Sequence, residues 1–234
     1  MASKADKSLR RQRIVVIGVV AVIVGLLAWL YGIVLVDAPG GEFVEGEHYQ
    51  LIDNPRRVRG DKVEVMEFFS YGCIHCYEFD PELAEWVEAH KADVKFVRMP
   101  ATGSNYWRML ARTYYTMETL GVLEQDHTAL FAEIHAARRV LDTPQKIAEW
   151  IDGRGTTSDA FLAAFDSPPV DNLVQGADQM GRRLKVASVP TIIVAGKYLV
   201  RATSDVGPSR MLDVMDYLVS KEKEPATPVT DPSG

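Results

Sequence analysis

Cysteine is scarce in this sequence: only Cys73 and Cys76 occur among 234 residues. Two cysteines exclude a small scaffold held by several disulfides, and they exclude a zinc site built from four thiolates of one chain. Basic residues are also few beyond the N-terminus. Residues 37–234 carry 21 Lys and Arg against 31 Asp and Glu, a net charge of −10. A body this acidic is not expected to bind nucleic acid, because such binding requires basic patches that meet phosphates.

Charge is missing altogether from residues 14–36, a run of 23 positions. As a helix, this run is about 35 Å long, enough for a hydrocarbon core of about 30 Å. Five Lys and Arg precede the run, and acidic residues follow it. This asymmetry predicts an uncleaved signal-anchor helix in a lipid bilayer, with the N-terminus in the cytoplasm. A cleaved signal peptide is the alternative, although its apolar region is normally about 7–15 residues long.

Small residues recur along one face of this expected helix, at spacings of 3, 4, 3 and 4. They are Gly18, Ala21, Gly25, Ala28 and Gly32. Small residues allow helix backbones to approach closely in lipid, so the stripe suggests contact with a second transmembrane helix. The alternative is a passive anchor whose glycines and alanines only reflect membrane composition.

Composition divides the chain into five predicted segments. These are a cytoplasmic basic segment (1–13), a transmembrane anchor (14–36), a Gly-containing linker (37–47), one soluble domain (48–221) and a Pro-containing disordered tail (222–234). The soluble domain has 174 residues, which is enough for a single hydrophobic core.

Hydrophobic periodicity predicts the order of elements in the soluble domain. Alternating or apolar runs at 62–69, 94–99, 191–195 and 198–200 are typical of strands, the last two joined by a hairpin at Gly196-Lys197. Helices are expected from residue 74, throughout a block at about 104–186, and over 208–220. This order fits an α/β domain of the thioredoxin-like fold with a helical insertion, although many α/β proteins share it.

The motif Cys73-Ile74-His75-Cys76 follows a buried strand and opens a helix. Unpaired N–H groups at a helix N-terminus stabilise a thiolate, so the pKa of Cys73 is expected to be lowered, and His75 adds a further donor or positive charge. Cys76, one turn inward, is expected to be the resolving thiol. Half of a zinc site and a pair of inert cysteines are the alternatives, and the spacing and context favour redox chemistry.

Two stretches resemble a known family. Glu67–Tyr77 (EFFSYGCIHCY) resembles the active-site stretch of the DsbA family, periplasmic thiol:disulfide oxidoreductases of bacteria. The segments VASVPT (186–191) and VAGKY (194–198) resemble its second signature, more than a hundred residues further on. The sequence departs from the family at Ile74, where the best-known members have proline.

The resemblance implies roles for the residues around the two sulfurs. Cys73 is the nucleophile that forms a mixed disulfide with the substrate, Cys76 resolves it, and His75 stabilises the Cys73 thiolate. The redox group is the Cys73-Cys76 disulfide itself, so no cofactor and no metal are implied.

The resemblance also implies a binding edge and a buried acid. Pro190 is the cis-proline that faces the disulfide, and Val189 presents backbone groups to an extended substrate segment. Ile74 is the other expected substrate-binding residue. Glu67 matches a buried acid that moves protons to or from Cys76, although an outward-facing strand glutamate is the alternative; Arg98 falls near that acid.

The expected function is donation of the disulfide to reduced exported proteins by an anchored oxidase. A DsbB-like, quinone-linked membrane oxidase is the implied reoxidising partner. The expected localisation is a single pass through a bacterial inner membrane with the catalytic domain in the periplasm. The alternatives are a disulfide reductase or isomerase, a non-catalytic membrane-tethered folding factor, and a metal-binding module.

Overall fold

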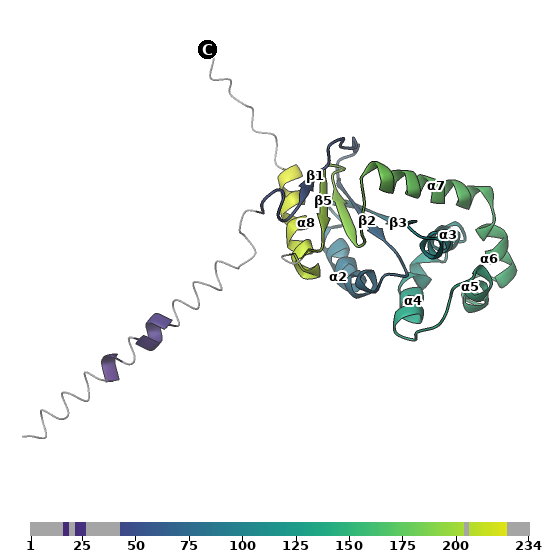
Figure 1. Cartoon of the computed structure of the whole chain (residues 1–234), viewed down its shortest axis with the longest axis horizontal. Coiled ribbons are helices and arrows are strands. Elements are labelled where there is room, and N and C mark those ends of the chain that lie inside the picture. Colours follow the sequence, from purple (N-terminus) through teal and green to yellow (C-terminus); the bar gives the residue numbers. More distant parts are fainter. Residues whose placement is uncertain (1–15, 19–21, 27–42, 204–205, 224–234) are drawn as a thin grey trace, which may run out of the picture. The chain divides into compact units, whose positions relative to one another are not determined.

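The computed structural model describes residues 16–18, 22–26, 43–203 and 206–223 (Figure 1). The chain divides into two compact units, Met1–Glu42 and Phe43–Gly234. In the first unit, the described residues are helical and exposed. The second unit contains the sheet, the helices that cover it and all the predicted site residues.

A five-stranded mixed sheet forms the centre of the second unit, in the order β1-β5-β4-β2-β3. The strands are β1 (Gln50–Leu51), β2 (Val63–Phe69), β3 (Val94–Pro100), β4 (Thr191–Val194) and β5 (Tyr198–Arg201). The β2 and β3 strands run parallel, while β4 is antiparallel to both of its neighbours, β2 and β5. The β2 strand is almost completely buried because it lies inside the sheet and both of its faces are covered.

Two sets of helices pack against the sheet. Helices α2 (Ile74–His90) and α8 (Pro208–Lys223) contact each other, and α8 contacts β2, β4 and β5. The other helices lie between β3 and β4 in the chain. They are α3 (Asn105–Thr119), α4 (Leu123–His135), α5 (Pro144–Ile151), α6 (Ser158–Phe165) and α7 (Pro168–Arg183). In Figure 1, α3 to α6 form a group beside the β3 edge, and α7 returns the chain to the sheet.

Local sequence signals explain where several of these helices begin. Thr143 is the N-cap of α5: its hydroxyl accepts a hydrogen bond from the Lys146 N–H, and Pro144 occupies the first turn. Thr157 caps α6 and Ser104 caps α3 in the same way. These caps satisfy N–H groups that have no partner within the helix.

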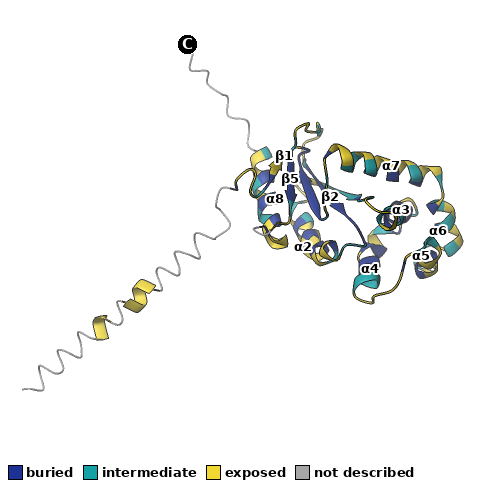
Figure 2. Cartoon of the chain, in the orientation of Figure 1, coloured by how far each residue is buried: buried dark blue, intermediate teal, exposed yellow. Residues whose placement is uncertain are grey.

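The helical insertion has its own buried core. Leu110, Met117, Phe131 and Ile147 belong to a cluster that reaches Phe69 and Cys76, whereas Val65, Phe79 and the inner face of α8 form a second cluster. Figure 2 shows the dark, buried strands between helices whose outer faces are exposed. The active-site helix α2 therefore lies where the two cores meet.

The predicted order of strands and helices is confirmed, with one addition. The β1 strand, which was not expected, has two exposed residues and pairs with β5. It is too short to produce a periodic pattern. The limits of the five predicted segments stay predictions.

The predicted transmembrane anchor, 14–36, lies largely outside the described residues, and so do Ala21, Ala28 and Gly32 of its small-residue stripe. Within the described ranges, no helix has the length and apolar character needed to cross a membrane. The described residues therefore do not support the predicted single pass or a helix partner in the bilayer.

Candidate active site

The two cysteines lie at the start of α2, in different surroundings. Cys73 is the N-cap of the helix and is partly exposed, whereas Cys76 is completely buried; both are free thiols. The turn before them leaves no room for a side chain at Gly72, because a Cβ there would lie 2.9 Å from Tyr106 and 3.2 Å from Trp107. Glycine at this position thus allows α3 to approach the motif closely.

The surroundings move the two thiol pKa values in opposite directions. The pKa of Cys73 is lowered to about 6, first by the hydrogen bond from the Cys76 thiol and then by the N–H groups of Cys76 and His75, against the effect of burial. Burial, followed by the hydrogen bond to Cys73, raises the pKa of Cys76. At neutral pH, Cys73 is therefore the thiolate and Cys76 the thiol.

His75 and Ile74 lie on the surface beside the reactive sulfur. The His75 side chain is 72% exposed, and its Nδ1 lies 3.3 Å from Glu78 Oε2. Its charge is the smallest of the effects that lower the Cys73 pKa. The motif could not show this, because spacing does not reveal that the ring turns outward. Ile74 is 45% exposed and presents an apolar side chain next to Cys73.

A loop from the far end of the chain lies against Cys73. The Val189–Pro190 peptide bond is cis, the conformation that the sequence resemblance implies. Cys73 Sγ lies 3.6 Å from the carbonyl oxygen of Val189, to which the protonated thiol can donate, and the Thr191 hydroxyl donates to the Ser188 carbonyl over 2.7 Å. The structure thus brings Val189 and Pro190 to the sulfur.

Glu67 is buried beneath the motif on β2, with 1% of its surface exposed. Its Oε2 accepts a hydrogen bond from Arg98 Nε over 3.0 Å. Burial raises the pKa of Glu67 to about 7, although the Arg98 charge acts in the opposite direction. Strand alternation alone left the direction of this side chain open. The covered faces of β2 explain why it is buried.

Three residues that sequence reasoning missed continue the polar network from Arg98. Arg98 Nη2 donates to Asp80 Oδ1 over 2.6 Å, and His127 Nε2 lies 3.2 Å from the same oxygen. The Tyr71 hydroxyl lies 2.7 Å from His127 Nδ1. Because the Asp80 carboxylate only accepts, Nε2 carries the proton of a neutral His127 ring, and Nδ1 accepts from Tyr71.

The surroundings of the network determine which of its groups are charged. Burial raises the pKa of Asp80, but the hydrogen bond from His127 and the Arg98 charge outweigh burial, so this pKa is lowered. Burial lowers the pKa of His127, which favours the neutral ring. Asp80 thus neutralises Arg98, and Glu67 is the carboxyl group that can carry a proton near pH 7.

The positions of two of these side chains had a signal in the sequence. Asp80 follows Cys76 by four residues on the same helix, so both lie on one face. Glu67 and Arg98 are directly paired in the register of β2 and β3. His127 comes from the insertion, and nothing in the local sequence places it here.

A cysteine pair at the start of a helix, opposite a cis-proline loop on a mixed sheet, defines a thioredoxin-fold redox protein. The sequence model described as Thioredoxin matches residues 58–214, so the chain belongs to this family. Within it, the chain belongs to the DsbA family of thiol:disulfide interchange proteins. It is 34% identical to DsbA of Pseudomonas aeruginosa, over 86% of this chain and 94% of that protein. It is 38% identical to DsbA of Azotobacter vinelandii, over 74% of this chain and 83% of that protein.

Solved structures agree with this assignment. The crystal structure of P. aeruginosa DsbA matches with a TM-score of 0.73 and 35% identity, covering 78% of this chain and 96% of that one. The structure of the oxidoreductase DsbA from Xylella fastidiosa matches with a TM-score of 0.72 and 34% identity, covering 77% and 97%. The chain is a protein thiol:disulfide oxidoreductase, and its redox group is a cysteine pair rather than a bound cofactor.

One prediction is wrong. The sequence predicted a single-pass protein of the bacterial inner membrane, with the N-terminus in the cytoplasm and the catalytic domain in the periplasm. The DsbA relatives and the absence of a membrane-spanning helix from the described ranges contradict this placement. The apolar run at 14–36 was interpreted from its length and its charged flanks, and these do not by themselves decide between an anchor and other apolar N-terminal segments.

Proposed function

We propose that this protein donates a Cys73-Cys76 disulfide to reduced exported proteins. In the first step, a substrate thiolate attacks Cys73 Sγ, the Cys73–Cys76 bond breaks, and Cys76 leaves with the electron pair. In the second step, another substrate thiolate attacks the substrate sulfur of the mixed disulfide, and Cys73 leaves as a thiolate. The substrate is oxidised by two electrons, and the cysteine pair is reduced by two.

The asymmetry of the two thiols supports this direction and is the observation that carries the proposal. A thiol with a low pKa is the better leaving group, and Cys73, with its pKa of about 6, leaves in the step that releases the product. Cys76 has a raised pKa and must take up a proton when it leaves. We assign this proton to Glu67, whose pKa of about 7 allows it to hold a proton at neutral pH and give it up.

The size of the oxidising effect follows from the same pKa. Stabilising the Cys73 thiolate to a pKa of about 6 favours the reduced protein at pH 7 by at most about 1.4 kcal/mol, or about 30 mV. Solvent at this partly exposed sulfur reduces the gain further. Stabilisation of the thiolate by itself therefore makes the disulfide only modestly more oxidising.

Two partners complete the proposed cycle. Val189 offers backbone groups to an extended segment of the reduced substrate, as in strand addition. A quinone-linked membrane oxidase of the DsbB type is the proposed source of the new disulfide, because the cysteine pair must be reoxidised after each transfer.

The proposal is tested by disulfide transfer to a peptide with two cysteines. The oxidised protein should yield one peptide disulfide per molecule, and Cys73→Ser should yield none. Cys76→Ala should remain joined to a peptide that carries an activated disulfide, because the resolving thiol is missing. Transfer by Cys73→Ser, or none by the parent protein, would contradict the proposal. An equilibrium with glutathione then gives the potential.

A further inference from the structure

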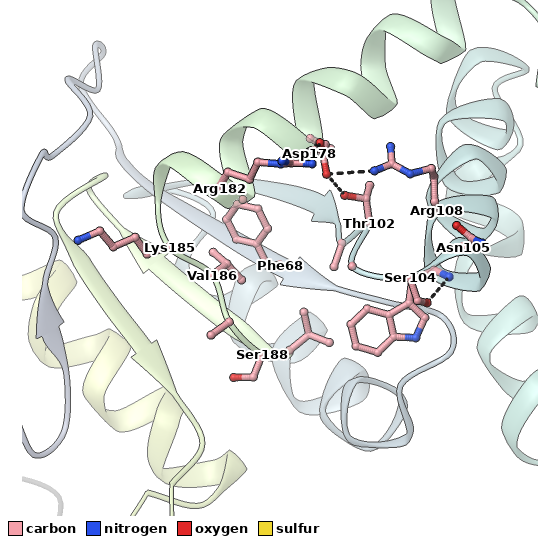
Figure 3. Close-up of a pocket in the computed structure, with 17 residues that line it drawn as sticks. Phe68, Thr102, Ser104, Asn105, Arg108, Asp178, Arg182, Lys185, Val186 and Ser188 are labelled. Atoms are coloured by element: carbon pink, nitrogen blue, oxygen red, sulfur yellow. Dashed lines mark hydrogen bonds and ion pairs between the residues drawn. The ribbon is translucent and has the colours of Figure 1, made fainter.

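A cavity of about 500 Å³ lies on the insertion side of the sheet, and Val189 is the one residue of its lining that the proposed function already uses. Its walls are the loop after β3, the first turn of α3, the C-terminal half of α7 and the segment 185–189 (Figure 3). It is therefore built by both the sheet and the helical insertion.

This cavity adjoins the reactive sulfur on two sides. Val189 lines the cavity, and its carbonyl oxygen lies 3.6 Å from Cys73 Sγ. Trp107 also lines it and packs against Gly72, the residue before Cys73. A substrate segment that pairs with Val189 while its cysteine reaches Cys73 therefore places neighbouring side chains at the cavity.

The floor of the cavity is apolar. Phe68 of β2, Ala177 and Gly181 of α7, and Val186 contribute to it. Gly181 faces Phe68, because a Cβ at this position would lie 3.7 Å from the Phe68 ring. A larger residue at 181 would therefore occupy part of the space.

One wall of the cavity carries surplus positive charge. Asp178 accepts hydrogen bonds from Thr102 over 2.7 Å and from Arg108 over 3.2 Å, and Arg182 Nη2 donates to its other oxygen over 2.8 Å. Figure 3 shows Asp178 between Arg182 and Arg108. Two guanidinium groups thus share one carboxylate, which leaves a net charge of +1. Lys185, on the rim, is already paired with Asp53 at 2.6 Å.

We propose that this cavity is a substrate subsite that selects an acidic side chain close to the cysteine being oxidised. An apolar neighbour of that residue would cover the floor beside Phe68, and the carboxylate would meet Arg108 and Arg182. Residues 37–234 carry a net charge of −10, so most of the surface repels an acidic segment. The positively charged wall attracts such a segment locally. The inference rests on the proposed function, because it concerns the substrate of the same sulfur.

The test is a set of reduced two-cysteine peptides in which one position near the first cysteine is Glu, Gln or Lys. The position is varied over several residues on each side. At one or two positions, kcat/KM should be about two- to five-fold higher for Glu than for Gln, and lowest for Lys, as for a partly exposed ion pair. High salt should reduce the preference. The Glu and Gln peptides are compared on the same protein variant. A change in the reactivity of the sulfurs affects both peptides equally and therefore cancels in the ratio of their kcat/KM values.

Arg182→Gln should bring this ratio close to one, whereas Arg183→Gln should keep it. Arg183 is exposed on the same helix and loses the same charge, but it does not line the cavity. Gly181→Leu should likewise lower kcat/KM for peptides with an apolar neighbour, compared with Gly176→Leu, whose added side chain points into open space. Equal ratios in the parent protein, Arg182→Gln and Arg183→Gln would overturn the proposal.

A binding measurement separates this inference from the proposed function. Peptides with serine in place of both cysteines cannot be oxidised, so their affinity, measured by calorimetry, reports the subsite alone. Tighter binding of the Glu peptide that is lost in Arg182→Gln supports the subsite even if no disulfide is transferred. Equal binding of Glu and Gln peptides overturns the subsite even if oxidation proceeds.

Discussion

At the scale of single residues, the site depends on how two identical side chains come to differ. Cys73 and Cys76 are three positions apart, yet one sulfur lies at a helix start and the other in the core. The pKa of Cys73 is lowered mainly by the hydrogen bond from the Cys76 thiol, so the second cysteine of the pair sets the acidity of the first. The histidine between them, which the motif suggested as a further stabiliser of the thiolate, points outward to Glu78.

This order of effects gives a prediction for two variants. Cys76→Ala removes the thiol hydrogen bond and should raise the pKa of Cys73 by about 1 to 2 pH units, the worth of a hydrogen bond to a charged group. His75→Ser removes only an exposed charge and should raise it by less than about one unit. Ultraviolet thiolate absorbance followed across pH measures both. A larger rise in His75→Ser than in Cys76→Ala would show that the histidine dominates.

At the residue scale, the sequence pointed to side chains whose chemistry and spacing are local, and their roles stay predictions. The cysteine motif, the glutamate on β2 and Arg98 lie on neighbouring strands or one helix, and the structure brings them together. His127 and Tyr71 could not be expected as partners, because 56 residues separate them and only the packing of the insertion brings them into contact.

At the scale of elements, the strands and helices were predictable because their hydrophobic patterns are clear. The hairpin between β4 and β5 is an example: Gly196 has a φ of +66°, in the left-handed region that favours glycine. Gly196 also contacts the segment before β2. Its carbonyl oxygen accepts a hydrogen bond from the Arg56 N–H over 2.9 Å. That second role depends on a distant contact, and the turn signal could not reveal it.

Gly196→Ala should therefore lower the free energy of unfolding by about 1–3 kcal/mol. The added Cβ would lie 2.5 Å from the Arg56 carbonyl oxygen, in a backbone conformation that alanine rarely adopts. Gly176→Ala, in α7 with open space around it, should instead stabilise the protein by about 0.4–1 kcal/mol. Urea unfolding of both variants measures the two effects. A Gly196→Ala variant as stable as the parent would mean that the turn can relax away from Arg56.

At the scale of the whole molecule, the insertion completes the site as well as adding to the fold. It supplies His127 to the buried network and Trp107 to the turn before Cys73. The network is shared between the two cores, so the charges beneath the sulfurs are coupled to the folding of both. The stability of the molecule should consequently depend on pH through groups at the active site.

Among the groups that set this dependence, Glu67 and Cys73 have opposite signs. The folded protein raises the pKa of Glu67 from 4.5 to about 7, so it binds this proton more tightly than the unfolded chain does. Stability from Glu67 is therefore complete below about pH 4.5 and declines by on the order of 3 kcal/mol as the pH rises to about 7. The folded protein lowers the pKa of Cys73 from 9.0 to about 6, so the reduced form gains stability between these values.

Comparison of the reduced and oxidised proteins separates the two groups, because only the reduced protein has a Cys73 thiol to titrate. Between pH 6 and 8.5, the reduced protein should become more stable relative to the oxidised one as the pH rises. Between pH 4.5 and 7, both should lose stability, and Glu67→Gln should remove most of that loss. Urea unfolding at each pH gives the four curves. If Glu67→Gln retained the full decline, the proton would reside elsewhere in the network, and Glu67 could not be the group that supplies it to Cys76.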